Sequence, residues 1–178
     1  MRRLSSALAL SIVATTACGE LPLTGPTKVP DQGTVTTAHA TAPVRPYGGH
    51  CETTFVILPA QPGDPPNLQR LHIDGICQLR HLGRTAVSAE QTVTFGPTGT
   101  AIAATIIYVA ANGDRLFSAF SGTGTLPDQN FMVTFTGTET FAGGTGRFVS
   151  ATGWASTSGS ASLLTSTGQL DASGTLSY

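Results

Sequence analysis

From Leu68 onward, apolar and polar residues alternate along the chain in short runs. In one run Leu71, Ile73, Cys77 and Leu79 occupy alternate positions, with mostly polar residues between them. The segment that ends at Phe95 repeats this alternation. A period of two residues places apolar side chains on one face of an extended chain, so the pattern predicts half-buried β-strands.

The same reasoning divides the chain into successive strands separated by turn sequences. Asn112-Gly113 is a strong hairpin signal, because both residues tolerate the positive φ of a type I′ turn. Segment 101–110 is apolar at both parities, which predicts a strand buried on two sides. The expected strands cover residues 51–58, 68–80, 84–95, 101–110, 115–125, 131–141, 148–158, 161–167 and 169–178.

Eight or nine short strands without an amphipathic helix are typical of an antiparallel sandwich or a closed barrel. Thr-rich strands with few charges would make poor exposed edges, and a barrel removes edges altogether. We therefore predict an all-β fold, an antiparallel closed barrel of eight (or nine) strands. A barrel of that size can be filled by side chains or hold one small ligand.

The N-terminal region differs in composition from the strand region. Residues 1–17 combine Arg2-Arg3, a short apolar run and small residues, which is typical of an export signal peptide. Nine of the 11 prolines fall between Pro22 and Pro66, so residues 18–49 are interpreted as a Pro/Thr-rich tether. The barrel domain is then expected over residues 50–178.

Three cysteines are an odd number for an exported protein. Ala17-Cys18-Gly19 resembles a bacterial lipoprotein cleavage site, at which Cys18 would be lipidated; ordinary cleavage near Ala17 is the alternative. Cys51 and Cys77 would remain as a disulfide pair in an oxidising compartment. Two unpaired thiols or a metal pair are the alternatives, but the sequence lacks the spacing of a metal site. The expected location is extracytoplasmic, as a lipoprotein of the bacterial cell envelope or a secreted protein.

Charge and composition exclude several functional classes. Nine Lys and Arg face ten Asp and Glu, a balance that does not suit a nucleic-acid binder. Lys28 is the single lysine and lies in the predicted tether, so the sequence argues against catalysis by a lysine side chain. Nucleophile-elbow, zinc-protease and phosphate-loop motifs are absent from the sequence. We expect no cofactor and no metal.

One glycine-rich stretch resembles a known family. Residues 143–153 read Gly-Gly-Thr-Gly-Arg-Phe-Val-Ser-Ala-Thr-Gly, which is similar to a segment of the allene oxide cyclase and dirigent barrels. Residues 138–141 and 81–84 resemble secreted bacterial relatives of that class. The resemblance implies an eight-stranded barrel with a ligand cavity in its mouth, often trimeric in the plant members. It carries over no catalytic residue. On physical grounds, the glycines allow a tight turn and Phe148 plugs the end of the core.

Few side chains are candidates for chemistry or binding. Glu139 shares the parity of Phe131 and Phe135, so it would point into the barrel and serve as a weak catalytic or ligand-cavity candidate. Alternatively, a bulge near Gly137 turns it outward, or an arginine such as Arg147 or Arg84 pairs with it. Tyr108 and Trp154 are further ligand-cavity candidates, although such aromatics also fill cores. His72 and Asp74, two residues apart, could hold a surface ion weakly or be part of a solvated face.

The leading functional hypothesis is therefore an exported, lipid-anchored barrel module that binds a small apolar ligand or serves an envelope structural role. One alternative is a cyclase- or isomerase-type enzyme that uses the cavity and Glu139. Another is an adhesive or oligomeric surface module. We favour a non-enzymatic role, contact with a membrane only through the lipid anchor, and no nucleic-acid partner; a homo-oligomer is left open.

Overall fold

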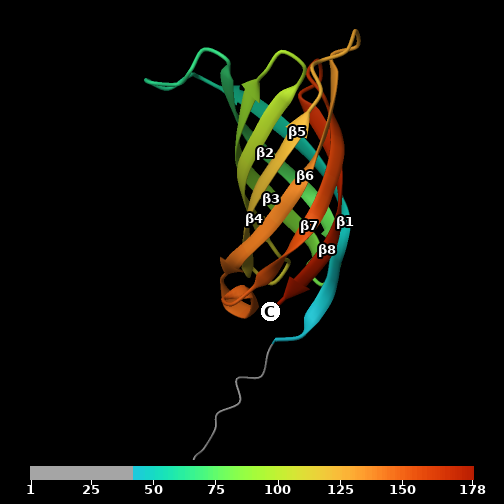
Figure 1. Cartoon of the computed structure of the whole chain (residues 1–178). Helices are drawn as coiled ribbons and strands as arrows, with labels where there is room; N and C mark the ends of the chain where they lie inside the picture. The colour runs from blue at the N-terminus through green and yellow to red at the C-terminus, as the bar shows by residue number, and fades with distance from the viewer. Residues whose placement is uncertain (1–41) are drawn as a thin grey trace, which may run out of the picture. The chain divides into compact units, whose positions relative to one another are not determined.

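The computed structural model describes residues 42–178, which form a closed barrel of eight antiparallel strands (Figure 1). Each strand pairs with the next along the chain, and β8 pairs with β1 to close the barrel. The all-β closed barrel predicted from the alternation is confirmed. The strands are β1 (Val44–Leu58), β2 (Leu68–Leu79), β3 (Gly83–Phe95), β4 (Thr100–Val109), β5 (Arg115–Gly124), β6 (Met132–Gly144), β7 (Thr152–Ser162) and β8 (Thr167–Ser177).

The predicted boundaries are wrong in three places. The strand expected over 148–158 begins at Thr152, because residues 146–148 form a 3-10 helix. β1 begins at Val44 rather than Cys51, because residues 44–49 of the predicted tether pair with β8. The predicted strand over 161–167 does not exist. Its first two residues end β7, and the chain then turns into β8. Around the end of β7, glycine, serine and threonine at both parities left no alternation to fix the strand end. The predicted signal peptide 1–17 and Cys18 lie outside the described residues.

β4 corrects the expectation of a strand buried on both sides. Its side chains alternate between buried and exposed positions, as in the other strands. Ala103 and Ile107 lie on the outer face, and Ala104 and Tyr108 face the interior. An apolar outer residue is common on protein surfaces and does not by itself indicate burial.

One end of the barrel is closed by the connection between β6 and β7. This connection contains the 3-10 helix η1 (Gly146–Phe148), and the Phe148 side chain is fully buried. Phe148 packs edge-on against Tyr178, with ring centroids 4.9 Å apart. A side chain at Gly146, whose φ is 55°, would overlap the Asp114 carboxylate. The expectation that Phe148 plugs the core is confirmed.

The cysteines of β1 and β2 form the expected disulfide. Cys51 and Cys77 are direct partners in the β1–β2 register and are bonded to each other. Both side chains are buried on the inner face of the barrel. The disulfide therefore joins two neighbouring strands in the lower half of the core, where the packed cluster includes Leu116 and Leu176.

No helix in the described part of the chain has the length and apolar character needed to cross a membrane.

Candidate functional site

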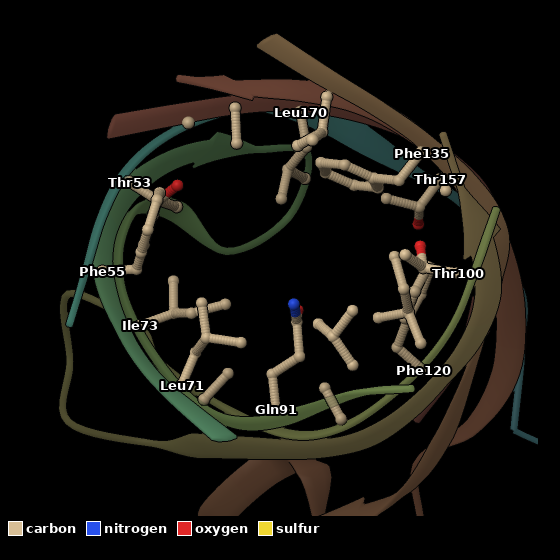
Figure 2. A pocket seen from close by; sticks show the side chains of 18 of the residues that line it. Thr53, Phe55, Leu71, Ile73, Gln91, Thr100, Phe120, Phe135, Thr157 and Leu170 are labelled. Atoms are coloured by element: carbon tan, nitrogen blue, oxygen red, sulfur yellow. The ribbon is translucent and has the colours of Figure 1, made fainter. Parts of the chain in front are cut away.

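The open half of the barrel contains a cavity of about 160 Å³. Figure 2 shows side chains projecting from all sides into a hollow centre. Leu71, Ile102 and Phe135 are among the apolar residues that line it. The loops between β1 and β2, β3 and β4, β5 and β6, and β7 and β8 surround its mouth (Figure 1). The lumen is therefore packed at the η1 end and hollow at the other.

The hollow half owes its shape to small residues on the inner faces of β5 and β6. The Phe120 ring lies directly over Gly137, where a β-carbon would overlap it. Phe120 and Phe135 meet edge to face, with ring centroids 6.4 Å apart. Both residues line the cavity. The glycine thus leaves room for an aromatic wall around an open centre.

Several polar side chains also line this largely apolar space, and Figure 2 labels Thr53, Gln91, Thr100 and Thr157. The Gln91 amide extends from β3 toward the centre of the lumen, and Thr157 faces the lumen from β7 (Figure 2). Thr157 is only 5% exposed, and its hydroxyl has no hydrogen-bond partner among the described residues. A buried hydroxyl without a partner destabilises the protein unless something else bonds to it. The cavity thus has polar groups available for a guest molecule.

Glu139 lies at the floor of the cavity, with 1% of its surface exposed. The Ser118 hydroxyl of β5 donates a hydrogen bond to Glu139 Oε1. Burial raises the pKa of Glu139 above its ordinary value, and the hydroxyls of Ser118 and Tyr108 offset part of that shift. Burial disfavours the charged carboxylate, so the arrangement favours a neutral carboxyl group at higher pH than usual.

Tyr108 completes the polar floor, and the buried Tyr47 lies close to both Tyr108 and Glu139. Burial is the largest cause that raises the pKa of both phenols, and the nearby Glu139 adds to it. The Tyr47 hydroxyl is buried and, within the described residues, has no partner at hydrogen-bonding geometry. Its ring packs edge to face on Phe141, with centroids 4.6 Å apart. The carboxyl group of Glu139 and the hydroxyl group of Tyr108 therefore line the floor, and the hydroxyl groups of Ser118 and Tyr47 are buried beside them.

The structure shows which way the Glu139 side chain points. Its side chain points inward, as its parity predicted, and the one bulge between β5 and β6 lies between Leu116 and Ser118 rather than near Gly137. Arg147 does not pair with it. That guanidinium donates to the His81 carbonyl oxygen at 2.8 Å and lies 3.8 Å from Asp114. Arg84 is exposed at the start of β3 and is not a partner of Glu139 either. Among the described residues, neither the bulge near Gly137 nor an arginine partner of Glu139 is found.

The other predicted site residues divide between inside and outside. Tyr108 is 3% exposed and lines the cavity, as predicted. Trp154 is 53% exposed on the outer face of β7, so its expected place in the cavity is corrected. Its neighbour Ala155 is the one that faces inward. Small residues on both sides of Trp154 gave no clear parity from which to predict this.

His72 belongs to a polar group on the outer face. Its two ring nitrogens lie 2.6 Å from Glu90 Oε1 and 3.1 Å from Asp74 Oδ2. The hydrogen bond with Glu90 is the largest cause that raises the pKa of His72. Among residues 42–178 no group of three or more His, Cys, Asp or Glu side chains has the arrangement of a metal site.

Sequence reasoning missed Gln91, Thr157, Ser118 and Tyr47. Ser118 shares the parity of Leu116 and Phe120, which could have placed it on the inner face. Tyr47 was assigned to the tether, where no alternation marks an inner face. Polar residues on an inner face are not distinguishable by periodicity alone when the neighbouring residues are small and polar.

We predict that Glu139→Gln flattens the pH dependence of stability. The folded pKa of Glu139 exceeds the unfolded value, so its stabilising effect is complete below the unfolded pKa and is lost as pH rises toward the folded pKa. In that window wild type should lose about 1.4 kcal/mol per pH unit relative to the variant. Urea unfolding of both proteins from pH 4 upward measures the difference.

Glu52→Gln is the matched control, because Glu52 is exposed on the outer face of β1. It should leave the slope unchanged. Equal slopes for wild type and Glu139→Gln would mean that Glu139 ionises as readily in the folded barrel as in the unfolded chain.

No family model, curated protein or solved structure was found to match this chain. The resemblance to the allene oxide cyclase and dirigent barrels therefore stays a prediction.

Proposed function

We propose that the barrel binds one small, largely apolar ligand that carries a hydrogen-bonding group. The observation that carries this proposal is the hollow half of the lumen, where apolar walls surround the Gln91 amide and the Thr157 hydroxyl, which has no partner among residues 42–178. Concave apolar sites with a few inward polar groups are the usual form of small-molecule sites. A barrel built only for rigidity would fill this space with side chains.

The cavity volume limits the size of the ligand. An apolar protein cavity of about 150 Å³ binds benzene, and the lumen here measures about 160 Å³. The enclosed part therefore fits a single ring, a compact bicycle or a short alkyl chain. A longer molecule would extend through the mouth between Phe95 and Leu163, which line its upper edge.

The polar groups define the chemistry of the ligand. Thr157 can donate and accept a hydrogen bond, and the Gln91 amide can do the same. A pure hydrocarbon would leave both groups unpaired in a dry cavity, which is unfavourable. An alcohol, ketone or similar oxygen function on an apolar skeleton would pair with them. Anionic ligands are disfavoured, because no basic side chain lines the described cavity.

The test is a titration with 2-naphthol and with naphthalene. Ala104 faces the lumen and lines the cavity, and its neighbour Ala103 is exposed on the outer face of the same strand. Ala104→Trp would fill the cavity, so it should weaken 2-naphthol binding by about tenfold or more, equivalent to 1.4 kcal/mol. Ala103→Trp should leave the affinity unchanged. Isothermal calorimetry or naphthol fluorescence measures both.

A second arm examines the hydrogen-bonding group. Wild type should prefer 2-naphthol over naphthalene, and Thr157→Val, which keeps the side-chain shape, should reduce that preference. Equal binding by the Ala103 and Ala104 variants would place the site outside the lumen. Equal affinity for both probes in wild type would remove the polar part of the proposal.

A cyclase- or isomerase-type enzyme is the second candidate function. The observation that favours it is the buried Glu139 carboxyl at the cavity floor, flanked by Ser118 and Tyr108. A neutral carboxyl group in an apolar site can donate a proton or hydrogen bond to a reacting molecule. Glu139→Gln should then abolish turnover while 2-naphthol still binds. If Glu139→Gln changes stability but neither turnover nor 2-naphthol binding, the role of Glu139 is structural.

We also propose that the protein is exported and anchored through Cys18. The disulfide between Cys51 and Cys77 supports an oxidising, extracytoplasmic compartment. Intact-mass measurement of the protein from its host envelope would show a lipid-modified N-terminal Cys18. A mass equal to the unmodified chain cut near Ala17 would point to ordinary secretion. The adhesive or oligomeric module stays a prediction.

A further inference from the structure

Exposed apolar side chains gather around the open end of the barrel. Six of the 12 large hydrophobic side chains that are exposed among the described residues lie at the mouth or in its loops. We call this set the apolar rim. It consists of Ile57, Phe95, Leu126, Phe131, Leu163 and Leu164, which are 36–69% exposed.

The rim carries almost no free charge. The four loops at this end contain two acidic residues, Asp64 and Asp128, and no lysine or arginine. Arg70 holds Asp64 with hydrogen bonds of 2.8 and 2.7 Å, which lower the pKa of that carboxyl to about 2. Asp128 Oδ1 accepts backbone N–H groups of Asn130 and Met132, each at 2.8 Å. A surface of this kind has nothing to attract a polyanion, and it suits a neutral apolar phase.

The loop between β5 and β6 is built to hold an aromatic ring outward. Phe131 has a φ of 58°, a left-handed conformation that is rare for a bulky residue. Its N–H bonds to the Asp128 carbonyl oxygen at 3.0 Å, and its own carbonyl oxygen accepts the Leu163 N–H at 3.0 Å. The parity of β6 would turn Phe131 into the lumen, but the side chain is 51% exposed. The strained backbone therefore keeps the ring at the rim, beside the turn that presents Leu163 and Leu164.

The rim is continuous with the cavity. Phe95 and Leu163 are exposed at the surface and also line the upper edge of the hollow lumen. At these two residues an apolar surface thus extends from the outside of the molecule into the cavity. A patch around the mouth of an apolar cavity differs in this respect from scattered surface hydrophobics, which need no explanation.

We propose that the apolar rim docks onto a neutral lipid surface, with the loop tips inserted among the lipids at the membrane interface. Aromatic and aliphatic side chains on an uncharged edge bind such an interface in proportion to the apolar area they bury. Against a second copy of this chain, the ring of separate loop tips would offer contact only around an opening. A lipid surface is deformable and can cover all of the tips at once.

The length of chain before the barrel allows this contact for the anchored protein. β1 enters at the closed end, opposite the rim (Figure 1). Cys18 and Val44 are 26 positions apart, and an extended chain of that length reaches about 85 Å. The 15-residue β1 spans about 50 Å at most. The chain between Cys18 and β1 is therefore long enough to pass the full height of the barrel. A protein anchored at Cys18 can place its rim on the same membrane, which is a second contact beyond the lipid anchor predicted from the sequence.

The test uses tryptophan quenching by brominated phosphatidylcholine vesicles. Trp154 is the single tryptophan of the chain and lies on the outer wall away from the mouth, so the anchored wild-type protein supplies the control. The double variant Leu164→Trp/Trp154→Phe moves the probe to the rim, where residue 164 is 69% exposed. We expect loss of most fluorescence for the rim probe and little loss for Trp154. Circular dichroism checks that the variant folds, and Leu126→Trp offers a second probe position.

Matched charge substitutions complete the design. Adding Leu126→Asp and Phe131→Asp to the rim-probe variant should abolish quenching, whereas Val44→Asp and Val149→Asp at the closed end should preserve it. Equal quenching at the rim and at Trp154 would overturn the proposal. So would a rim probe shielded from lipid in a dimer, which native mass spectrometry would detect.

Docking does not require that the cavity hold a ligand. Passage of an apolar molecule between lipid and lumen does rest on the proposed binding function. Quenching at the rim without 2-naphthol binding would support the docking proposal and contradict the ligand-binding proposal. Binding of 2-naphthol without quenching at the rim would contradict only the docking proposal.

Discussion

Phe148→Ala should destabilise the barrel by about 3–5 kcal/mol, the range measured for removal of a fully buried phenylalanine. Phe148 is 0% exposed and packs against Tyr178, while the Arg147 guanidinium lies 4.7 Å from the centre of its ring. Its backbone closes the η1 turn through bonds with Thr145 and Ala151. Removing the ring leaves a void next to the C-terminal strand. Urea or thermal unfolding measures the loss.

Val149→Ala is the matched control for the closed end. Val149 is the next residue but is 70% exposed, so its truncation should change stability by no more than about 0.5 kcal/mol. Similar losses for the two variants would mean that the β6–β7 connection does not close the core. A small loss for Phe148→Ala alone would show that neighbouring side chains collapse into the space.

Replacing both Cys51 and Cys77 by alanine should lower the free energy of unfolding by about 3 kcal/mol, because the disulfide restricts the unfolded chain. The two cysteines are 26 residues apart in sequence and pair directly across β1 and β2. Their side chains are buried in the closed-end core, so alanine keeps the positions apolar. Denaturant unfolding of wild type and variant, with and without reductant, measures the change.

Reductant provides the internal control for this substitution. It should destabilise wild type by a similar amount and leave the alanine variant unaffected. A variant as stable as oxidised wild type would contradict a contribution from the disulfide. If reductant changes the stability of the variant, that change must come from Cys18, the one cysteine left in its sequence.

Most of the fold could be predicted from the alternation of apolar and polar residues. Leu71 and Ile73 predicted the inner face of β2, and parity placed Glu139 inside the barrel four strands later. This inference works because a strand has a strict period of two and the closed barrel has one apolar side. The disulfide partners also followed from the sequence, since only Cys51 and Cys77 remained once Cys18 was set aside.

Other features depend on contacts that no local pattern encodes. The start of β1 at Val44 is determined by pairing with β8, which lies at the other end of the domain in sequence. Trp154 was misplaced because serine, threonine and glycine surround it in β7. The wall of the cavity depends on the position of Phe120, whose ring fits against Gly137 on a neighbouring strand. Whether a barrel of small and large residues is filled or hollow depends on such cross-strand packing.

The central claim is that the hollow half of the lumen holds the ligand. The most direct test is NMR of the protein with 2-naphthol, observing nuclear Overhauser effects between the naphthol ring and assigned methyl groups. We predict contacts to Leu71, Ile102 and Ala104, which line the cavity. Contacts confined to outer-face methyls such as Ala103 and Ile107, with none to the lumen, would contradict it.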